Sequence, residues 1–193
     1  MKRLCVFCGS SQANSKRIVA AARQLGEAIA LRGIELVFGG SHVGLMGVMA
    51  GAALACGGKV IGVLPRFMAD KELAHTELTQ LHLVDTMHER KQLMAELAES
   101  LVALPGGFGT LEEIFEAITW GQLHLHSYPC GVLNVDGYYD RQIEFLRRTV
   151  ADGFVRKEQF KSLIVASEVQ ELFQQFKNFR PVKSEKWIPR QLI

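Results

Sequence analysis

Short apolar runs alternate with segments of helical periodicity along nearly the whole chain. Most of these runs are bounded by glycine, proline or polar residues, which is typical of strands buried on both faces of a parallel sheet. Seven runs have this form: 4–8, 36–38, 59–64, 81–84, 101–104, 130–135 and 163–166. The segments between most of them carry apolar residues every three or four positions, as at 18, 21, 22, 25 and 29, which predicts helices that pack by one face.

Six helices are predicted in this way: 15–32, 45–56, 86–99, one from 110 onward, 138–151, and one from 167 or 168 to 179. Strands that alternate with helices imply right-handed crossovers and helices on both faces of the sheet. The sequence therefore predicts an α/β fold of the Rossmann-like, doubly wound kind, with a mostly parallel sheet. The segment 66–80 has no clear period and is long for a connection, which favours a functional or mobile loop.

The size of the chain suits one domain. It has 193 residues, of which 48% are hydrophobic and 22% charged, and these can bury one good core. We expect a single domain over residues 1–180. A polar tail, 181–193, follows it and contains Pro181 and Pro189.

The charge balance argues against two classes of partner. With 22 basic and 20 acidic residues the formal net charge is +2, which gives no case for nucleic acid or an anionic membrane as the main partner. The apolar run near the N-terminus is too short for a signal peptide, and we find no apolar stretch of membrane-spanning length. We expect a cytoplasmic protein.

A glycine-rich loop lies between a buried strand and a helix. The run 101–104 ends at Pro105, and Gly106, Gly107 and Gly109 follow before the helical period begins at Thr110. A strand, a glycine loop and a helix N-terminus together bind phosphate, because unpaired amides and the positive end of the helix dipole point to one place. Neither the Walker A pattern nor the dinucleotide fingerprint fits this loop.

Glu113 has two interpretations at this stage. Thr110 and Glu113 have the spacing of a capping box, in which Thr110 is the N-cap and Glu113 reaches back to its amide. The alternative is a catalytic carboxylate, which a position near a helix N-terminus biases toward the ionised form. Spacing alone leaves the two open.

Arg90 is also locally out of place. A cation in the first turns of a helix opposes the helix dipole, and Arg90 shares a face with Met94 and Leu97, which are expected to pack. A buried arginine needs an anionic partner. The candidates are a bound phosphate or carboxylate, or a carboxylate of the chain: Glu72, Glu112 or Glu113.

Cysteines and histidines offer no clear metal site. The cysteines stand apart in apolar contexts, which favours buried thiols over a metal or redox pair: Cys5, Cys8, Cys56 and Cys130. His124 and His126 lie two positions apart, so on a helix they would face different ways. We expect no metal.

The glycine loops are expected to meet. Gly9 follows the first strand, residues 39–44 follow the second, Pro65 ends the third, and residues 106–109 follow the fifth. In doubly wound sheets ligands bind outside the carboxyl ends of the strands, so these loops predict one shared crevice.

Two motifs resemble a known family. The stretch 88–91, His-Glu-Arg-Lys, and the stretch 105–113, Pro-Gly-Gly-Phe-Gly-Thr-Leu-Glu-Glu, are similar to the paired signature of the LONELY GUY proteins, the cytokinin riboside 5'-monophosphate phosphoribohydrolases. Phe7 to Ser11, Gly44 to Gly47 and Ile118 to Trp120 add to the likeness, which runs from about Leu4 to Ala151. Ser41 departs from it, since the family commonly has glycine there.

The resemblance implies an activity and a set of residues. The activity is hydrolysis of the N-glycosidic bond of an adenosine 5'-monophosphate, with or without an N6 substituent, to the free base and ribose 5-phosphate. It implies no metal or organic cofactor, and a homodimer with active sites near the interface. Arg90 and Glu113 would be the catalytic pair. The implied substrate-binding residues are Glu72, Lys91, Gly107, Phe108, Gly109, Thr110, Leu111, Glu112 and Thr119.

The residues can support this chemistry. Cleavage of the ribosyl bond passes through an oxocarbenium-like state, which a fixed carboxylate stabilises while it orients or deprotonates water. The loop amides and Thr110 would hold the 5'-phosphate and so fix the sugar. Arg90 could neutralise the phosphate or orient Glu113, and the donor of a proton to the leaving base is not assigned.

Two other functions stay open. A nucleotide-binding or carrier module of the same fold would keep the glycine loop without needing Arg90 and Glu113 together. An amino-acid decarboxylase, a label sometimes given to this family, usually needs pyridoxal phosphate on a lysine, and the sequence offers no clear partner set for one.

Overall fold

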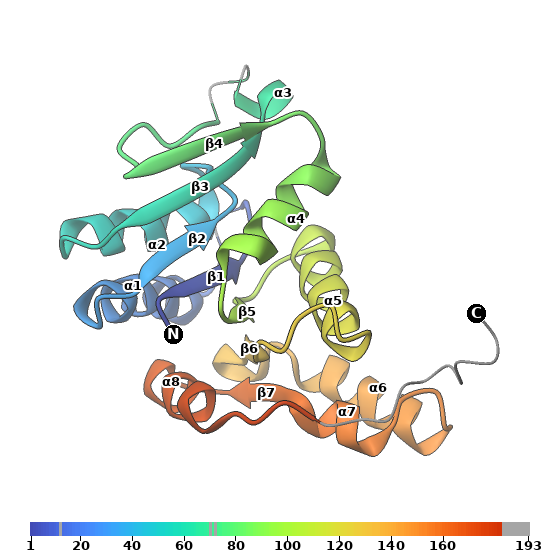
Figure 1. The fold of residues 1–193 in the computed structure, drawn as a ribbon. Helices are drawn as coiled ribbons and strands as arrows, with labels where there is room; N and C mark the ends of the chain where they lie inside the picture. Colours follow the sequence, from blue (N-terminus) through green and yellow to red (C-terminus); the bar gives the residue numbers. More distant parts are fainter. Residues whose placement is uncertain (12, 70, 72, 183–193) are drawn as a thin grey trace.

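One parallel sheet of seven strands organises the molecule. The computed structural model describes residues 1–11, 13–69, 71 and 73–182. The strand order is β4-β3-β2-β1-β5-β6-β7, and every paired neighbour in it is parallel (Figure 1). The strands are β1 (Arg3–Phe7), β2 (Glu35–Phe38), β3 (Val60–Pro65), β4 (Gln80–Val84), β5 (Leu101–Ala103), β6 (Cys130–Leu133) and β7 (Leu163–Ala166).

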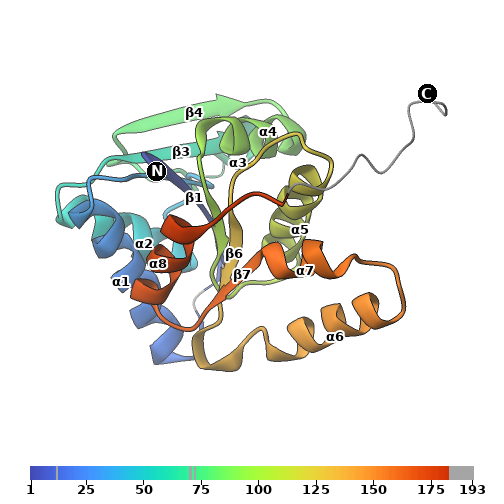
Figure 2. The same ribbon diagram turned by 60° about the horizontal axis from the view of Figure 1, so that its bottom comes forward.

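Helices cover both faces of this sheet. They are α1 (Lys16–Leu31), α2 (Gly44–Ala55), α3 (Arg66–Ala69), α4 (Met87–Leu97), α5 (Phe108–Gln122), the 3₁₀ turn η1 (Val135–Gly137), α6 (Asp140–Ala151), α7 (Lys157–Ser162) and α8 (Val169–Asn178). Figure 2 shows α1, α2 and α8 on one side of the sheet, with α4, α5, α6 and α7 on the other. The predicted doubly wound α/β fold is confirmed.

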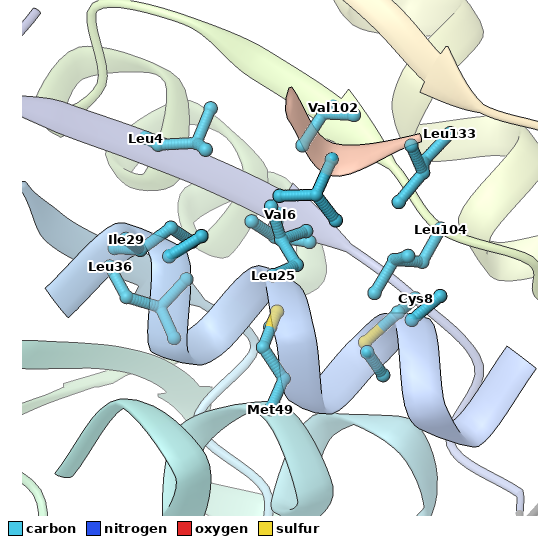
Figure 3. Close-up of a cluster of buried hydrophobic side chains, with 14 of the residues drawn as sticks. Leu4, Val6, Cys8, Leu25, Ile29, Leu36, Met49, Val102, Leu104 and Leu133 are labelled. Atoms are coloured by element: carbon cyan, nitrogen blue, oxygen red, sulfur yellow. The ribbon is translucent and has the colours of Figure 1, made fainter. Parts of the chain in front are cut away.

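An apolar core lies on each face of the sheet, and successive residues of β1 point alternately into one core and the other. Leu4 and Val6 pack with α1, α2 and α8, while Cys5 and Phe7 pack with α4, α5 and α6. Figure 3 shows the first core, where Leu25 of α1 points toward Val6 of β1 and Met49 of α2 points toward α1. This period of two is what a strand buried on both faces requires.

The order of the strands places a switch point in the middle of the sheet. From β1 the chain winds outward through β2, β3 and β4, then returns to the other side of β1 at β5 and continues to β6 and β7. The loops after β1 and β5 therefore diverge from adjacent strand ends. In such folds ligands bind at this point.

Several element boundaries differ from the sequence prediction. The short helices α3 and α7 were not predicted, and β6 ends at Leu133, where η1 follows instead of two more strand residues. Of the four thiols expected to be buried, Cys56 is exposed, because it lies at the C-terminal end of α2 rather than inside it; the other three are buried.

Within the described part of the chain, no helix is both long enough and apolar enough to cross a membrane. The predicted tail, 181–193, lies outside the described residues from 183 onward.

Candidate active site

The loops after β1, β2 and β5 meet at the switch point. The amide of Gly9 donates to the carbonyl of Pro105 at 3.2 Å, and the amide of Leu45 donates to the carbonyl of Gly9 at 3.1 Å. The segment after α3 joins them, because His75 N donates to Gly40 O at 3.0 Å. The expected convergence of these loops on one region is confirmed.

The helix after the glycine loop begins earlier than predicted. Gly107 is the N-cap of α5 and Phe108 its first residue, so Thr110 lies in the first turn instead of capping it. The predicted capping box of Thr110 and Glu113 is therefore wrong. The buried Thr110 side chain packs on the loop instead: a Cβ added to Gly106 would lie 2.1 Å from its Oγ1.

Among the described residues, no side chain caps the N-terminus of α5. Helix α4 differs, because Thr86 Oγ1 accepts from the amide of Glu89 at 3.1 Å, as its spacing predicts. The first amides of a helix have no partner within the helix. At α5 they lie beside the glycine loop and can receive an anionic group of a ligand.

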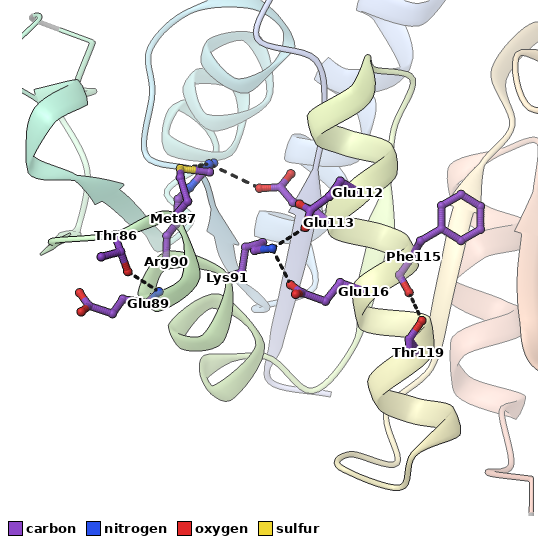
Figure 4. Close-up of polar contacts among 10 residues, drawn as sticks. All are labelled: Thr86, Met87, Glu89, Arg90, Lys91, Glu112, Glu113, Phe115, Glu116 and Thr119. Carbon is purple, nitrogen blue, oxygen red and sulfur yellow. Dashed lines mark hydrogen bonds and ion pairs between the residues drawn. The ribbon is translucent and has the colours of Figure 1, made fainter. Parts of the chain in front are cut away.

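Arg90 and Glu113 face each other between α4 and α5 (Figure 4). Arg90 Nη1 lies 3.5 Å from Glu113 Oε1, and the two side chains are each 9% exposed. Arg90 Nε also donates to the carbonyl of Val63 at 3.2 Å. A Cβ on Gly39 would lie 2.0 Å from Arg90 Nη2, so the absence of a side chain there makes room for the guanidinium. Of the two candidate carboxylates that the structure describes, Glu113 pairs with Arg90, whereas Glu112 pairs with Lys91.

The carboxylate of Glu113 is poorly satisfied for a buried group. Its Oε1 has no hydrogen-bond partner among the described residues, and the contact with Arg90 is a loose ion pair. The pKa of Glu113 is raised, mainly because the side chain is buried. The positive charge of Arg90 lowers this pKa and the negative charge of Glu112 raises it, and the net shift is upward. The expectation that the helix N-terminus favours the ionised form is outweighed, because the sequence did not reveal how deeply this side chain is buried.

Lys91 is held by two carboxylates of α5. Its Nζ forms an ion pair with Glu112 and another with Glu116 Oε2 at 3.1 Å (Figure 4). Burial lowers the pKa of Lys91, but the bonds to the two glutamates outweigh it, so the pKa is raised. Lys91 therefore ties α4 to α5 beside the Arg90–Glu113 pair.

The other residues of the predicted site differ in placement. Phe108 is 94% exposed, and a Cβ on Gly107 or Gly109 would meet no atom of the described residues within 4 Å, so none of these residues covers this side of the loop. Leu111 is half-buried on the first turns of α5. Thr119 is exposed, and its hydroxyl donates to the carbonyl of Phe115 at 2.7 Å.

Thr119 is also remote from the buried pair. It lies six residues beyond Glu113, or about 9 Å along the helix axis, so the structure does not bring it to that pair. Glu72 lies outside the described residues.

Two tyrosines that the sequence analysis did not single out hold the glycine loop. The hydroxyl of Tyr138 donates to the carbonyl of Gly106 at 2.7 Å, and that of Tyr139 donates to the carbonyl of Leu104 at 2.6 Å. Their only signal in the sequence is the Asp-Gly turn that precedes them, which gives no hint of a contact with a loop some thirty residues away.

No metal centre is evident in the described residues. They contain no group of three or more histidine, cysteine, aspartate or glutamate side chains placed to hold an ion.

Comparison with known proteins identifies close relatives in sequence. A family model described as possible lysine decarboxylase matches residues 46–176. The chain is 42% identical over 181 residues to the cytokinin riboside 5'-monophosphate phosphoribohydrolase LOG5 of Arabidopsis thaliana, which covers 94% of this chain and 79% of that protein. It is 43% identical over 180 residues to the probable cytokinin riboside 5'-monophosphate phosphoribohydrolase LOGL5 of Oryza sativa subsp. japonica, with coverage of 93% and 73%.

Solved structures share the fold at lower identity. The molybdenum cofactor binding protein of the phototrophic bacterium Rippkaea orientalis superposes with a TM-score of 0.70 at 21% identity, over 92% of this chain and 97% of that one. The molybdenum cofactor carrier protein of Chlamydomonas reinhardtii gives a TM-score of 0.69 at 22% identity, over 91% and 96%. At this identity the likeness establishes the fold alone.

Proposed function

We propose that this chain, which belongs to the LONELY GUY family of cytokinin riboside 5'-monophosphate phosphoribohydrolases, is itself such an N-glycosidase. Its substrates are adenosine 5'-monophosphates, with or without an N6 substituent. Water replaces the base at C1' of the ribose, and the products are the free base and ribose 5-phosphate.

The observation that carries this proposal is the state of Glu113. A buried carboxylate with an oxygen that lacks a hydrogen bond among the described residues is unusual, since buried polar atoms are nearly always paired. It lies on the first turns of α5, directly beyond the uncapped glycine loop. A poorly satisfied carboxylate beside an anion-binding loop suits a group that completes its contacts with substrate and water.

The chemistry assigned to Glu113 follows from its surroundings. A carboxylate stabilises the positive charge that develops on the ribose in the oxocarbenium-like transition state. The raised pKa of Glu113 makes it a better base toward the attacking water, whose proton it accepts. Arg90 opposes the rise in the pKa of Glu113 and so favours the ionised form, and its guanidinium lies 3.5 Å from the carboxylate.

The remaining roles divide between the loop and its supports. The amides of Gly107, Phe108, Gly109 and Thr110 bind the 5'-phosphate at the positive end of α5. Lys91 and Glu112 keep α4 and α5 together, so that Arg90 meets Glu113. We keep Glu72, Leu111 and Thr119 as substrate-binding residues because the family resemblance implies them.

Lys91 argues against the decarboxylase alternative. A lysine that forms a Schiff base with pyridoxal phosphate must offer a neutral amine, so its pKa is normally lowered. The pKa of Lys91 is raised by its two glutamate partners, which favours the protonated form. Lys91 is thus poorly suited to that role.

We further propose that the protein is a cytoplasmic homodimer. A cavity of about 890 Å³ lies between α4 and α5 and is bordered by Trp120 and Leu125. Leu125 is 70% exposed and Leu123 61% exposed, and apolar side chains at such exposure favour a partner surface. Analytical ultracentrifugation of wild type and Leu123→Lys tests the dimer, which a wild-type monomer would contradict.

Product analysis tests the enzymatic proposal. Purified protein is incubated with AMP and, separately, with isopentenyladenosine monophosphate, and the products are separated by liquid chromatography. Wild type is expected to release free base, and Glu113→Gln and Arg90→Ala to lower the rate on the order of a hundredfold or more. Glu144→Gln is the matched control, because Glu144 is exposed and pairs with Arg141 on α6.

The same experiment separates the competing functions. If wild type binds the nucleotide but releases neither base nor ribose 5-phosphate, the carrier alternative is correct. If Glu113→Gln keeps full activity, the catalytic assignment is wrong, and Glu113 is a structural partner of Arg90. The ratio of rates on the two substrates decides which nucleotide the enzyme prefers.

A further inference from the structure

We propose that Tyr138 is a positioning residue: its hydroxyl holds the carbonyl of Gly106 and thereby orients the amides that receive the substrate's 5'-phosphate. The proposal rests on the proposed function, because it takes the phosphate to bind at the N-terminus of α5. It concerns a residue outside the predicted site and outside the Arg90–Glu113 pair.

Two consecutive tyrosines support the turn between β5 and α5. Tyr139 bonds to the carbonyl of Leu104 at 2.6 Å, and Tyr138 to that of Gly106 at 2.7 Å, so the turn is held at both ends. The two rings meet edge to face, with centroids 5.0 Å apart and planes 85° apart. Each ring thus restrains the other, and both hydroxyls reach the turn from adjacent residues.

The bond to Gly106 restrains more than one atom. A peptide unit is planar and trans, so a fixed carbonyl of Gly106 also fixes the direction of the amide of Gly107, which points the opposite way. On its other side Gly106 is confined, because a Cβ there would lie 2.1 Å from Thr110 Oγ1 and 2.9 Å from Gly9 N. Beyond it, a Cβ on Gly107 or Gly109 would meet none of the residues that the structure describes. Tyr138 therefore acts on the last restrained peptide before the open part of the loop.

The turn that carries Tyr138 is itself well restrained. Asn134 Oδ1 accepts from the amide of Tyr139 at 2.7 Å. Asp136 and Gly137 both adopt left-handed backbone conformations, with φ of 53° and 70°, which direct the chain sharply from β6 toward the glycine loop. The backbone that carries the Tyr138 side chain is therefore held in a defined turn.

Burial separates the roles of the two tyrosines. Tyr139 is 2% exposed and belongs to the core on its face of the sheet, so its hydroxyl bond supports the fold. Tyr138 is 48% exposed, so its hydroxyl bond contributes little to global stability. Its effect is local, on the orientation of the loop.

The test compares Tyr138→Phe with Tyr139→Phe and with Tyr128→Phe, a matched control on the loop after α5. For Tyr138→Phe the KM for AMP is expected to rise by about three- to tenfold, the range of one neutral hydrogen bond, with kcat changed less than about twofold. The inhibition constant of ribose 5-phosphate rises by the same factor. That of adenosine, which carries no phosphate, stays the same. Tyr128→Phe matches wild type in all four measurements.

Thermal unfolding completes the test. Tyr138→Phe is expected to melt within about a degree of wild type, whereas Tyr139→Phe melts several degrees lower, because it leaves a buried carbonyl without its donor. The proposal is wrong if Tyr138→Phe leaves KM and the ribose 5-phosphate constant unchanged. It is also wrong if binding of adenosine weakens equally, or if the variant melts like Tyr139→Phe.

Failure of the proposed function has a different signature. In that case wild type releases no base, or Glu113→Gln stays active, whatever Tyr138→Phe does. An active wild type and an inactive Glu113→Gln, together with an unchanged Tyr138→Phe, contradict the role of Tyr138 alone.

Discussion

The ion pair of Arg90 and Glu113 predicts a stability defect that depends on pH. In the variant Arg90→Met, Glu113 loses the neighbour that most favours its ionised form, while burial and Glu112 continue to raise its pKa. Lys91 remains, but it is engaged by Glu112 and Glu116. The variant thus leaves a buried carboxylate with little compensation.

The magnitude follows from the geometry. Two opposite unit charges 3.5 Å apart attract by about 5 kcal/mol at an effective dielectric constant of about 20. Removal of one partner of a buried pair typically costs about 3–5 kcal/mol. We therefore expect Arg90→Met to lower the free energy of unfolding by about 3–4 kcal/mol at pH 8. The same loss raises the pKa of Glu113 further in the variant, because the neighbour that most favours its ionised form is gone.

The sign of the pH dependence is opposite to that of a usual salt-bridged carboxylate. Because the pKa of Glu113 is raised above its ordinary value, the folded state binds the carboxyl proton more tightly than the unfolded state does. The penalty therefore appears as pH rises through the folded-state pKa and is relieved as pH falls toward the unfolded value. At pH 5 we expect most of the defect to disappear, apart from the packing lost with the arginine.

Urea denaturation at pH 5 and pH 8 measures this effect. It compares wild type, Arg90→Met, the double variant Arg90→Met/Glu113→Gln, and Arg141→Met as a control for an exposed ion pair. The double variant is expected to recover most of the stability at pH 8 and to lose the pH dependence. An equal defect at both pH values, or the same defect in the double variant, would refute the reasoning.

Three further predictions concern the loop and its supports. Gly106→Ala is expected to abolish activity and to lower the free energy of unfolding by about 1–3 kcal/mol, because its Cβ would lie 2.1 Å from Thr110 Oγ1. Gly107→Ala is expected to melt like wild type, because its Cβ would meet none of the described residues. Thr86→Ala is expected to lower the free energy of unfolding by about 1 kcal/mol in urea, since α4 loses its cap; an unchanged value would mean that the cap is dispensable. Lys91→Met is expected to lower the free energy of unfolding by about 1–2 kcal/mol at every pH between 6 and 9, because the raised pKa keeps the lysine charged over this range. A loss of stability confined to part of that range would contradict this.

The strands and long helices could be predicted because each is long enough for its hydrophobic pattern to be recognised in the sequence. The seven strands and the six predicted helices all occur, most with boundaries within two residues. Helices α3 and α7, of four and six residues, are too short to show a period. The start of α5 was misplaced because Phe108 and Gly109 are helical although the glycines around them favour a loop.

The candidate site was less predictable, since its properties depend on tertiary contacts. The sequence indicated that Arg90 needs an anion but not which of three carboxylates would supply it. It placed Glu113 near a helix N-terminus, yet the direction of its pKa shift depends on burial, which local position does not reveal. Tyr138 was missed because its contact with Gly106 joins residues 32 positions apart.

The central pairing of β1 with β5 has a consequence for how the protein folds. Cys5 pairs with Leu101, so about half of the chain separates the two strands that form the middle of the sheet. Closing so long a loop is entropically unfavourable and slows folding. The glycine loop follows β5 closely, so its position depends on that pairing. Arg90 precedes β5 in the sequence, and Glu113 follows it. The N-terminal half can emerge from the ribosome and collapse around β1 to β4, but the Arg90–Glu113 site forms only after β5 has joined them.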